Sequence, residues 1–398
     1  MKLTFGLNPL AKHNTKILFW ATLFASVSFL EPVLVLFYLA RGLNAGNIFV
    51  LLLCFSISIL VFELPTGAFA DRFGPKASFL VGTGVDIISK LLLIFAHDPW
   101  MFYLSQVLHG LAGAFFSGAD ETLIYESLKE AGQEDRMSSV WGKIESASYI
   151  PMIASFLIGG FVAKDLLNWE FILLIGAGTA FHLASFFILF RVKNPAISDS
   201  YREHPFHHVR DGIGVIKRNP NLVKLFLNFT VVFIPTIVFT KFDQPYFTGA
   251  GLPVPVLGIL YAAAAAMSFL LSQNIAWLEK RMSRVAIMYS SGILTGAMLL
   301  VASLFIHQLV LAFFVFFIVK MTQAVRFPIY SHLSNAYIDS GSRATTISLL
   351  SILDSVMDIV IFSTLSLTAG FGLGTIFLGC SLVVFAGLLF PVREARTN

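Results

Sequence analysis

Fourteen ionisable side chains lie inside long apolar stretches of this sequence, and they are its main chemical resource. A charged side chain at bilayer depth costs about 2.5–3.5 kcal/mol or more, so such a group usually faces a cavity or a partner. So many charges favour a water-filled path over a bundle that only contacts lipid. The set holds nine acids and five bases: Glu31, Glu63, Asp86, Asp120, Glu121, Glu145, Asp243, Asp354, Asp358, Lys90, Lys143, Lys241, Lys320 and Arg326.

Three of the carboxylates in the first half of the chain could carry a proton. Glu31 lies about halfway along its apolar stretch, beside Pro32, which removes a backbone donor and can bend a helix. Asp120 and Glu121 are adjacent, and neighbouring carboxylates hold a shared proton more tightly than a single one does. The alternative for each is a static ion pair with a base on another helix, such as Lys143.

The second half carries a different set of charges. Asp354 and Asp358 are four residues apart and share one face of a helix, while Lys320 lies at mid-depth in the preceding stretch. Together they would hold a charged solute, or they would form a buried structural ion pair. Arg326, shortly before Pro328, would bind an anionic group of a solute or pair with a neighbouring carboxylate.

Two further pairs have a simpler expected role. Asp86 and Lys90 are spaced i,i+4 on one predicted helix, so they are expected to neutralise each other as a structural pair. Lys241 and Asp243 lie near the end of another predicted helix, where they are expected to reach the membrane surface or to form an outer gate contact.

Composition places the chain in a membrane. Of its 398 residues, 57% are hydrophobic and 13% are charged, about half the charged fraction of a typical soluble domain. The net charge of +4 includes no basic block that would indicate nucleic acid binding. Cys54 and Cys380 lie far apart in apolar stretches and are interpreted as small hydrophobic residues. Motifs for zinc proteases, Walker loops or serine nucleophiles are absent, so neither an enzyme, a metal site nor a cofactor is predicted.

The apolar stretches predict an all-α integral membrane protein with twelve transmembrane helices in two pseudo-symmetric six-helix bundles. Residues 1–191 would form the first bundle and residues 220–398 the second. Residues 192–219 would form a cytoplasmic linker that contains a short amphipathic helix. The predicted spans are 16–41, 46–70, 76–96, 100–128, 137–163, 168–191, 220–247, 254–278, 284–306, 308–337, 344–368 and 371–391.

The distribution of Lys and Arg predicts the orientation in the membrane. With the N-terminus inside, the inner segments hold twenty of these residues and the outer loops hold two, Arg41 and Lys164. The positive-inside rule then puts both termini in the cytoplasm. The expected location is the cell inner membrane, with the lipid bilayer as a partner and the chain as a monomer.

A short charged turn between the second and third predicted spans resembles the signature loop of the major facilitator superfamily. The matching positions are Gly67, Asp71, Arg72, Gly74 and Lys76, with Glu126 at the inner end of the fourth span as an expected partner. The second half echoes this turn at residues 276–284. Residues 63–67 and 118–128 also resemble a prokaryotic subgroup of efflux permeases within that family. The resemblance implies a latch in which Arg72 or Lys76 reaches Glu126, and in which Asp71 accepts hydrogen bonds near Arg343.

The resemblance implies a secondary active transporter that works by alternating access. We expect proton-coupled efflux of a small organic compound, with protons and that compound as partners. The alternative is a proton- or ion-coupled importer of a polar metabolite. Two departures from antiporter patterns weaken the case for proton antiport: Gln106 stands where an Arg is frequent, and Gly159-Gly160 comes late after Pro151. A sensor, an intramembrane enzyme and a channel are less compatible with the sequence.

Overall fold

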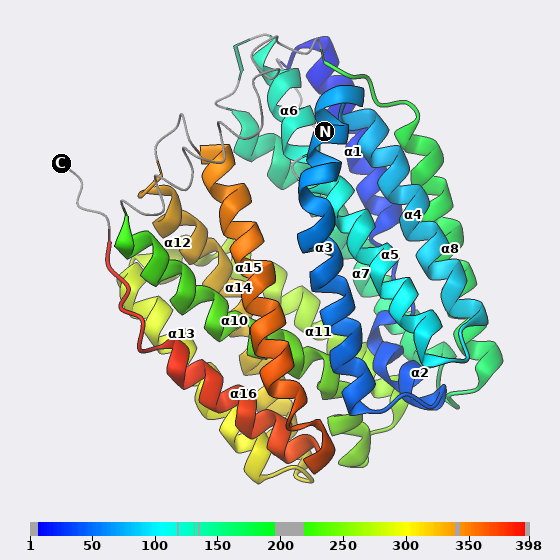
Figure 1. The fold of residues 1–398 in the computed structure, drawn as a ribbon, viewed down its shortest axis with the longest axis vertical. Coiled ribbons are helices and arrows are strands. Elements are labelled where there is room, and N and C mark those ends of the chain that lie inside the picture. Colours follow the sequence, from blue (N-terminus) through cyan, green and yellow to red (C-terminus); the bar gives the residue numbers. More distant parts are fainter. Residues whose placement is uncertain are drawn as a thin grey trace. The chain divides into compact units, whose positions relative to one another are not determined.

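The computed structural model describes residues 7–117, 119–130, 132–133, 136–195, 219–338 and 343–394, and within them the chain is helical and contains no strand (Figure 1). The chain divides into two compact units. Unit 1 comprises Met1–Phe37 and Val50–Glu203, and unit 2 comprises Tyr38–Phe49 and His204–Asn398. The amphipathic helix predicted in the linker, around His207 and His208, lies outside the described residues.

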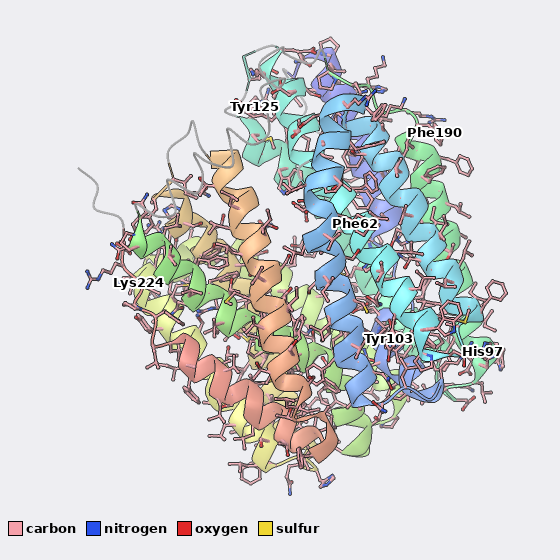
Figure 2. All side chains as sticks on the ribbon, viewed as in Figure 1. Phe62, His97, Tyr103, Tyr125, Phe190 and Lys224 are labelled. Atoms are coloured by element: carbon pink, nitrogen blue, oxygen red, sulfur yellow. The ribbon has the colours of Figure 1, made fainter. Side chains whose placement is uncertain are left out.

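The first half of the sequence forms six predicted spans, two of them interrupted. The elements are α1 (Pro9–Ala25), η2 (Glu31–Val33), α2 (Leu34–Ala40), α3 (Ala45–Phe73), α4 (Pro75–Phe95), α5 (Pro99–Phe116), α6 (Ala119–Lys129), α7 (Met137–Val162) and α8 (Asn168–Leu189). Figure 2 places Phe190, just after α8, and His97, just after α4, near opposite ends of unit 1, so these two helices run antiparallel.

The second half forms the other six spans. Its elements are α10 (Pro220–Gly249), α11 (Val254–Gln273), α12 (Ile275–Glu279), α13 (Arg284–Leu304), α14 (Leu309–Asn335), α15 (Arg343–Ser366), η6 (Ala369–Phe371) and α16 (Leu373–Gly387). The expected span 254–278 is divided at Asn274 into α11 and α12, and the expected span 100–128 is divided after Phe116 into α5 and α6.

Length and composition support membrane insertion. Nine helices in the described ranges are long and apolar enough to cross a bilayer. The remaining predicted spans correspond to α1 with α2, α5 with α6, and the short α16. Large apolar side chains cover the outward faces, and Phe187, Leu270, Phe314 and Leu382 are 61–65% exposed. Such faces are suited to contact with lipid.

The first span differs from the expected continuous helix over 16–41. The α1 helix ends at Ala25, and regular structure resumes only at Glu31. Pro32 explains the break, because its ring clashes with the carbonyl of the residue four positions earlier, which is Ser28. Pro32 was expected to bend the helix, and it instead accompanies a complete interruption.

Helix α7 holds this interruption in place. The Ser155 hydroxyl accepts a hydrogen bond from the backbone N–H of Ser28 at 3.2 Å. Gly159 packs directly on the Phe29 carbonyl, where even a methyl group would overlap the backbone. Glu31 therefore lies at the point where the helix is interrupted. Gly159 on the neighbouring helix makes this interruption possible, because a larger residue would not fit beside it.

Each unit has its own apolar core. In unit 1, side chains from α1, α4, α6, α7 and α8 pack together, including Leu18, Phe79 and Leu123. In unit 2, Leu225 of α10, Met288 of α13 and Ile329 of α14 form part of a corresponding core.

Replacing Gly159 with Ala should destabilise the protein, because the added Cβ cannot fit beside the Phe29 carbonyl. Overpacking of this kind costs about 1–3 kcal/mol. The apparent thermal unfolding midpoint of the purified protein in detergent would report the loss. Gly142→Ala is the matched control, since a Cβ at this other α7 glycine would meet nothing within 4 Å. Equal midpoints for the two variants would contradict the close approach of α7 to the break.

Candidate functional site

Arg326 of α14 is deeply buried, with 2% of its surface exposed. Its Nη1 donates to the Met288 carbonyl at 2.5 Å and to the Ser291 hydroxyl at 3.2 Å. Its Nη2 donates to the carbonyl and the side-chain oxygen of Asn228, at 2.7 and 2.5 Å. All of these acceptors are neutral, and no carboxylate of the described residues lies within ion-pair distance of Arg326. The charge is therefore stabilised by converging dipoles.

Asn228 extends this contact to a fourth helix. Its amide nitrogen donates to the carbonyls of Gly387 and Phe390, at 3.3 and 2.9 Å, at the end of α16. Phe390 lies just beyond α16, and its own backbone N–H also donates to the Gly387 carbonyl at 3.2 Å, so this carbonyl accepts from two donors. Asn228 and Arg326 thus join α10, α13, α14 and α16. This geometry favours a structural role for Arg326 over the predicted binding of an anionic solute or pairing with a carboxylate.

Asp354 of α15 is held by α10. The Thr230 hydroxyl donates to its carboxylate at 2.7 Å, and the Thr230 side chain is almost completely buried. The predicted cluster of Lys320, Asp354 and Asp358 stays a prediction; the contact described for the Asp354 carboxylate is the one with Thr230. Asp358 lies one turn further along α15 and is half-buried.

Lys320 lies against aromatic rings. Its ammonium nitrogen is 5.4 Å from the ring centroid of Tyr261 on α11 and 5.6 Å from that of Phe316, both within range of a cation–π interaction. The Tyr261 hydroxyl donates to Asp243 at 2.6 Å and accepts from the Gln244 amide at 3.2 Å. Asp243 is fully buried, so the expectation that its side chain reaches the membrane surface is wrong.

These contacts form a polar ladder between α10 and α14, with Tyr261 of α11 completing one rung. Gln323 donates to the Thr236 hydroxyl at 2.7 Å and supplies the middle rung. From Asn228 to Asp243 the ladder follows fifteen residues of α10, or about 22 Å of helix, which is most of the hydrocarbon thickness of a bilayer. We define the polar ladder as Asn228, Thr236 and Asp243 of α10, Arg326, Gln323 and Lys320 of α14, and Tyr261 of α11.

The ladder includes uncharged residues that the charge pattern of the sequence does not indicate. Asn228, Thr236 and Gln323 were not among the candidates. A signal for them exists in the sequence, because residues 320, 323 and 326 are three apart and share a helix face. The described residues contain no group of three or more His, Cys, Asp or Glu side chains that could hold a metal ion.

The proton candidates of the first half are separated along the chain. Glu31 is half-buried at the interruption before η2. Asp120 and Glu121 lie in the first turn of α6, and their side chains fall outside the described part of the chain. Their predicted pairing with Lys143 therefore stays a prediction.

The charged turn between α3 and α4 depends on one glycine. Gly74 has a φ of +82°, and a Cβ there would lie 2.6 Å from the Asn194 side chain. Asn194 in turn accepts a hydrogen bond from the Lys76 backbone N–H at 3.0 Å. Gly67 has open space around it, so no packing constraint requires glycine at that position.

The charges of this turn have local partners. Arg72 lies 5.2 Å from the ring centroid of Phe73, and Glu126 is buried with Lys129 at 3.6 Å. The predicted contact of Glu126 with Arg72 or Lys76 is not among the ion pairs of the described residues and remains a prediction. The predicted contact of Asp71 involves residues 343 and 344, whose side chains the description leaves out.

Comparison with known proteins decides the family. The family model described as Major Facilitator Superfamily matches residues 18–362. This chain belongs to the major facilitator superfamily. It is therefore a multi-pass membrane transporter and not an enzyme, and the predicted fold of twelve spans in two bundles is confirmed.

Relatives within the superfamily differ in how much of the chain they match. Multidrug resistance protein MdtH of Klebsiella pneumoniae (strain 342) is 30% identical over 218 residues, which is 54% of this chain and about half, 51%, of that relative. The MFS-type transporter YxaM of Bacillus subtilis (strain 168), described as uncharacterized, is 23% identical over 91% of this chain and 90% of its own length.

Solved structures share the fold at low sequence identity. Nucleoside transporter NupG aligns with a TM-score of 0.69 and 14% identity over 96% of this chain and 99% of its own. A D-xylose-proton symporter aligns with a TM-score of 0.70 and 12% identity over 96% of this chain and 97% of its own. Sequence identities this low support the superfamily fold alone.

Arg326→Lys should destabilise the transporter, because one ammonium has three N–H donors at a single point, whereas the two guanidinium nitrogens serve four acceptor atoms of Asn228, Met288 and Ser291. Each buried acceptor left without a donor costs about 1–3 kcal/mol. Thermal unfolding of the purified protein would measure the loss. Arg281→Lys is the matched control, since Arg281 lies on the exposed turn after α12 and stacks on Trp277. A larger loss in the control would contradict the structural role of Arg326.

Proposed function

We propose that this transporter exports a small amphipathic organic compound in exchange for protons that move inward. The observation that carries the proposal is the 218-residue match to proteins named for multidrug resistance. The proposal extends that name to this chain, which matches only about half of those relatives. Alternating access between bundles 1–191 and 220–398 would move the compound.

An apolar pocket in unit 2 supports the choice of an amphipathic compound. It has a volume of about 400 Å³, within the range of small-molecule sites, and it is lined mainly by α11 and α12 together with Val325 of α14. It opens at the surface of unit 2, where its lining residues Leu270 and Trp277 are more than half exposed. Val325 directly precedes Arg326, and Lys320 lies five residues earlier on the same helix. An apolar group of the compound would occupy this pocket, while Lys320 and its aromatic neighbours would hold a polar group.

The proton is assigned to carboxylates of the first half. Glu31 lies where the first span is interrupted, and interrupted helices commonly supply substrate and ion sites in transporters. Asp120 and Glu121 are the second candidates.

The strong excess of Lys and Arg in the inner segments supports an inner-membrane location with both termini in the cytoplasm.

Membrane vesicles of both orientations test the direction of transport. In everted vesicles with an acidic lumen, fluorescent amphipathic compounds should accumulate several-fold above vesicles whose pH gradient has been collapsed. The expected driving force is proton movement from the lumen to the outside. Accumulation in right-side-out vesicles under an inward proton gradient would overturn export and identify an importer, the other function that the sequence allows.

The variant Glu31→Gln, measured in the same assay, tests whether Glu31 couples proton movement to transport of the compound. It should abolish gradient-driven accumulation and leave exchange of labelled for unlabelled compound intact, because exchange needs no net proton movement. Asp165→Asn is the control, since Asp165 is exposed on the turn between α7 and α8, beside Lys164. Gradient-driven transport by Glu31→Gln at the wild-type rate would show that Glu31 does not carry the proton.

The α3–α4 turn is assigned a latch function during turnover. Asp71→Asn should slow transport about tenfold or more and leave equilibrium binding of the compound nearly unchanged, because the turn lies outside the pocket. Transport rates and binding isotherms on the same preparation would separate the two effects. Asp98→Asn, on the exposed α4–α5 turn, is the matched control. Equal losses of binding and turnover would contradict a latch.

A further inference from the structure

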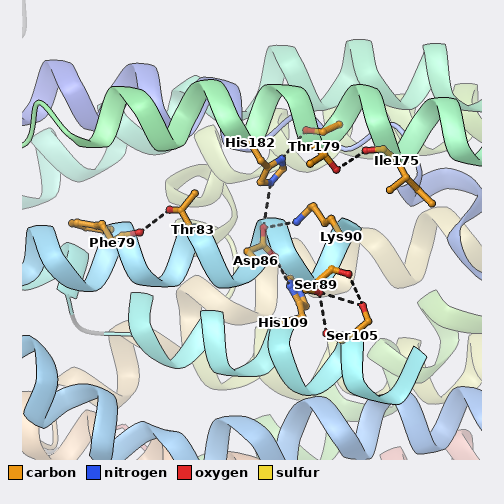
Figure 3. A network of polar contacts seen from close by, with 11 residues as sticks. Phe79, Thr83, Asp86, Ser89, Lys90, Ser105, His109, Ile175, Thr179 and His182 are labelled. Atoms are coloured by element: carbon orange, nitrogen blue, oxygen red, sulfur yellow. Dashed lines mark hydrogen bonds and ion pairs between the residues drawn. The ribbon is translucent and has the colours of Figure 1, made fainter. Parts of the chain in front are cut away.

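A cluster of four ionisable residues lies inside unit 1 and includes the predicted Asp86–Lys90 pair. Asp86 of α4 is buried at its centre and forms an ion pair with Lys90, as the sequence predicts. The structure adds two histidines: His109 of α5, whose Nδ1 is 2.8 Å from Oδ1 of Asp86, and His182 of α8, whose Nε2 is 3.6 Å from Oδ2 (Figure 3). Among the described residues of α4, α5 and α8, these are the charged or titratable groups that face Asp86.

The position of the protons on the two rings follows from their partners. A carboxylate only accepts, so Nδ1 of His109 carries a proton and fixes Oδ1 of Asp86. The Gly178 carbonyl likewise only accepts, so Nδ1 of His182, 3.0 Å away, carries the proton of that ring. Nε2 of neutral His182 is therefore a bare lone pair, and it faces a carboxylate oxygen.

The distance at this point agrees with that assignment. Two acceptors cannot bond each other, and 3.6 Å between Nε2 and Oδ2 is longer than a hydrogen bond. One proton placed on Nε2 would convert the contact into a charge-assisted hydrogen bond. Lys90 faces the same oxygen, Oδ2, so the ammonium and a protonated His182 compete for one acceptor.

We propose that unit 1 contains a proton-binding site formed by Asp86, Lys90, His109 and His182. In this site, a proton binds Nε2 of His182, and the resulting N–H donates to Oδ2 of Asp86 in place of the Lys90 ammonium. A hydronium ion of the solvent gives up the proton: one O–H bond breaks, one N–H bond forms from the Nε2 lone pair, a water molecule is left, and nothing is oxidised or reduced. The cluster is neutral with Lys90 in place, and it is neutral again when the proton replaces that ammonium. Its use in coupling rests on the proposed proton exchange, whereas its existence does not.

The variant Lys90→Gln tests the site without any transport measurement. At about pH 8 it leaves one uncompensated negative charge, so the thermal unfolding midpoint should fall by about 5 °C or more relative to wild type. At about pH 5.5 the proton on His182 restores neutrality and most of that difference should disappear. Stability gained on acidification is the expected sign, because the folded variant binds the proton more tightly than the unfolded chain does.

Three further variants make the result decisive. The recovery at acid pH should be lost in Lys90→Gln/His182→Gln and retained in Lys90→Gln/His109→Gln. Asp86→Asn/Lys90→Gln, which carries no charge pair, should show no deficit at either pH. Lys164→Gln is the surface control, since Lys164 is exposed beside Asp165. The proposal is overturned if the Lys90→Gln deficit is the same at both pH values, or if recovery depends on His109 and not on His182.

Gradient-driven transport by Asp86→Asn then tests the coupling separately. Loss of coupling alongside the pH-dependent stability would support a role of the site in transport. A pH-dependent stability without any proton-driven transport in the wild type would leave the proton site established and refute proton exchange as the function.

Discussion

A guanidinium in the interior of a membrane protein needs hydrogen-bond partners there too, and unit 2 supplies them for both terminal nitrogens of Arg326, although not for its Nε. Asn228 and Met288 supply backbone carbonyls at 2.7 and 2.5 Å, and Asn228 also supplies a side-chain oxygen at 2.5 Å. Asn228 then uses its amide group to satisfy the end of α16. Four helices are thereby held in one register, and the ladder toward Lys320 begins from this fixed point.

The two units treat buried charge differently. In unit 2, Arg326 is stabilised by neutral dipoles, and Lys320 lies against aromatic rings. In unit 1, Asp86 is surrounded by groups that can exchange protons or be replaced by one another. A charge held by fixed dipoles keeps the same partners. A carboxylate that two donors share can be bound by one donor or by the other, so it has two alternative sets of hydrogen bonds. The first arrangement suits a scaffold, and the second suits a group that changes state.

Hydropathy and charge patterns predicted most of the helical architecture, because a span of about twenty apolar residues has few alternatives in lipid. They could not predict that the first span stops at Ala25, since this break depends on Gly159, which is more than a hundred residues away. The site was predicted less well. Charged residues stand out in an apolar sequence, but the partners of Asp354 and Arg326 are Thr230 and Asn228, whose residue types also occur at many unremarkable helix positions.

The end of α8 has a mechanical consequence. After α8, the Lys193 backbone exchanges hydrogen bonds with the Asn14 side chain, and Asn194 binds the Lys76 backbone. Residues 193 and 194 are therefore anchored to both α1 and the start of α4. A force applied along the chain beyond Pro195 would act first on these anchors, and only then on the helices themselves. Because Asn194 binds the Lys76 backbone, tension on the connection between the two halves of the sequence would be transmitted to the α3–α4 turn.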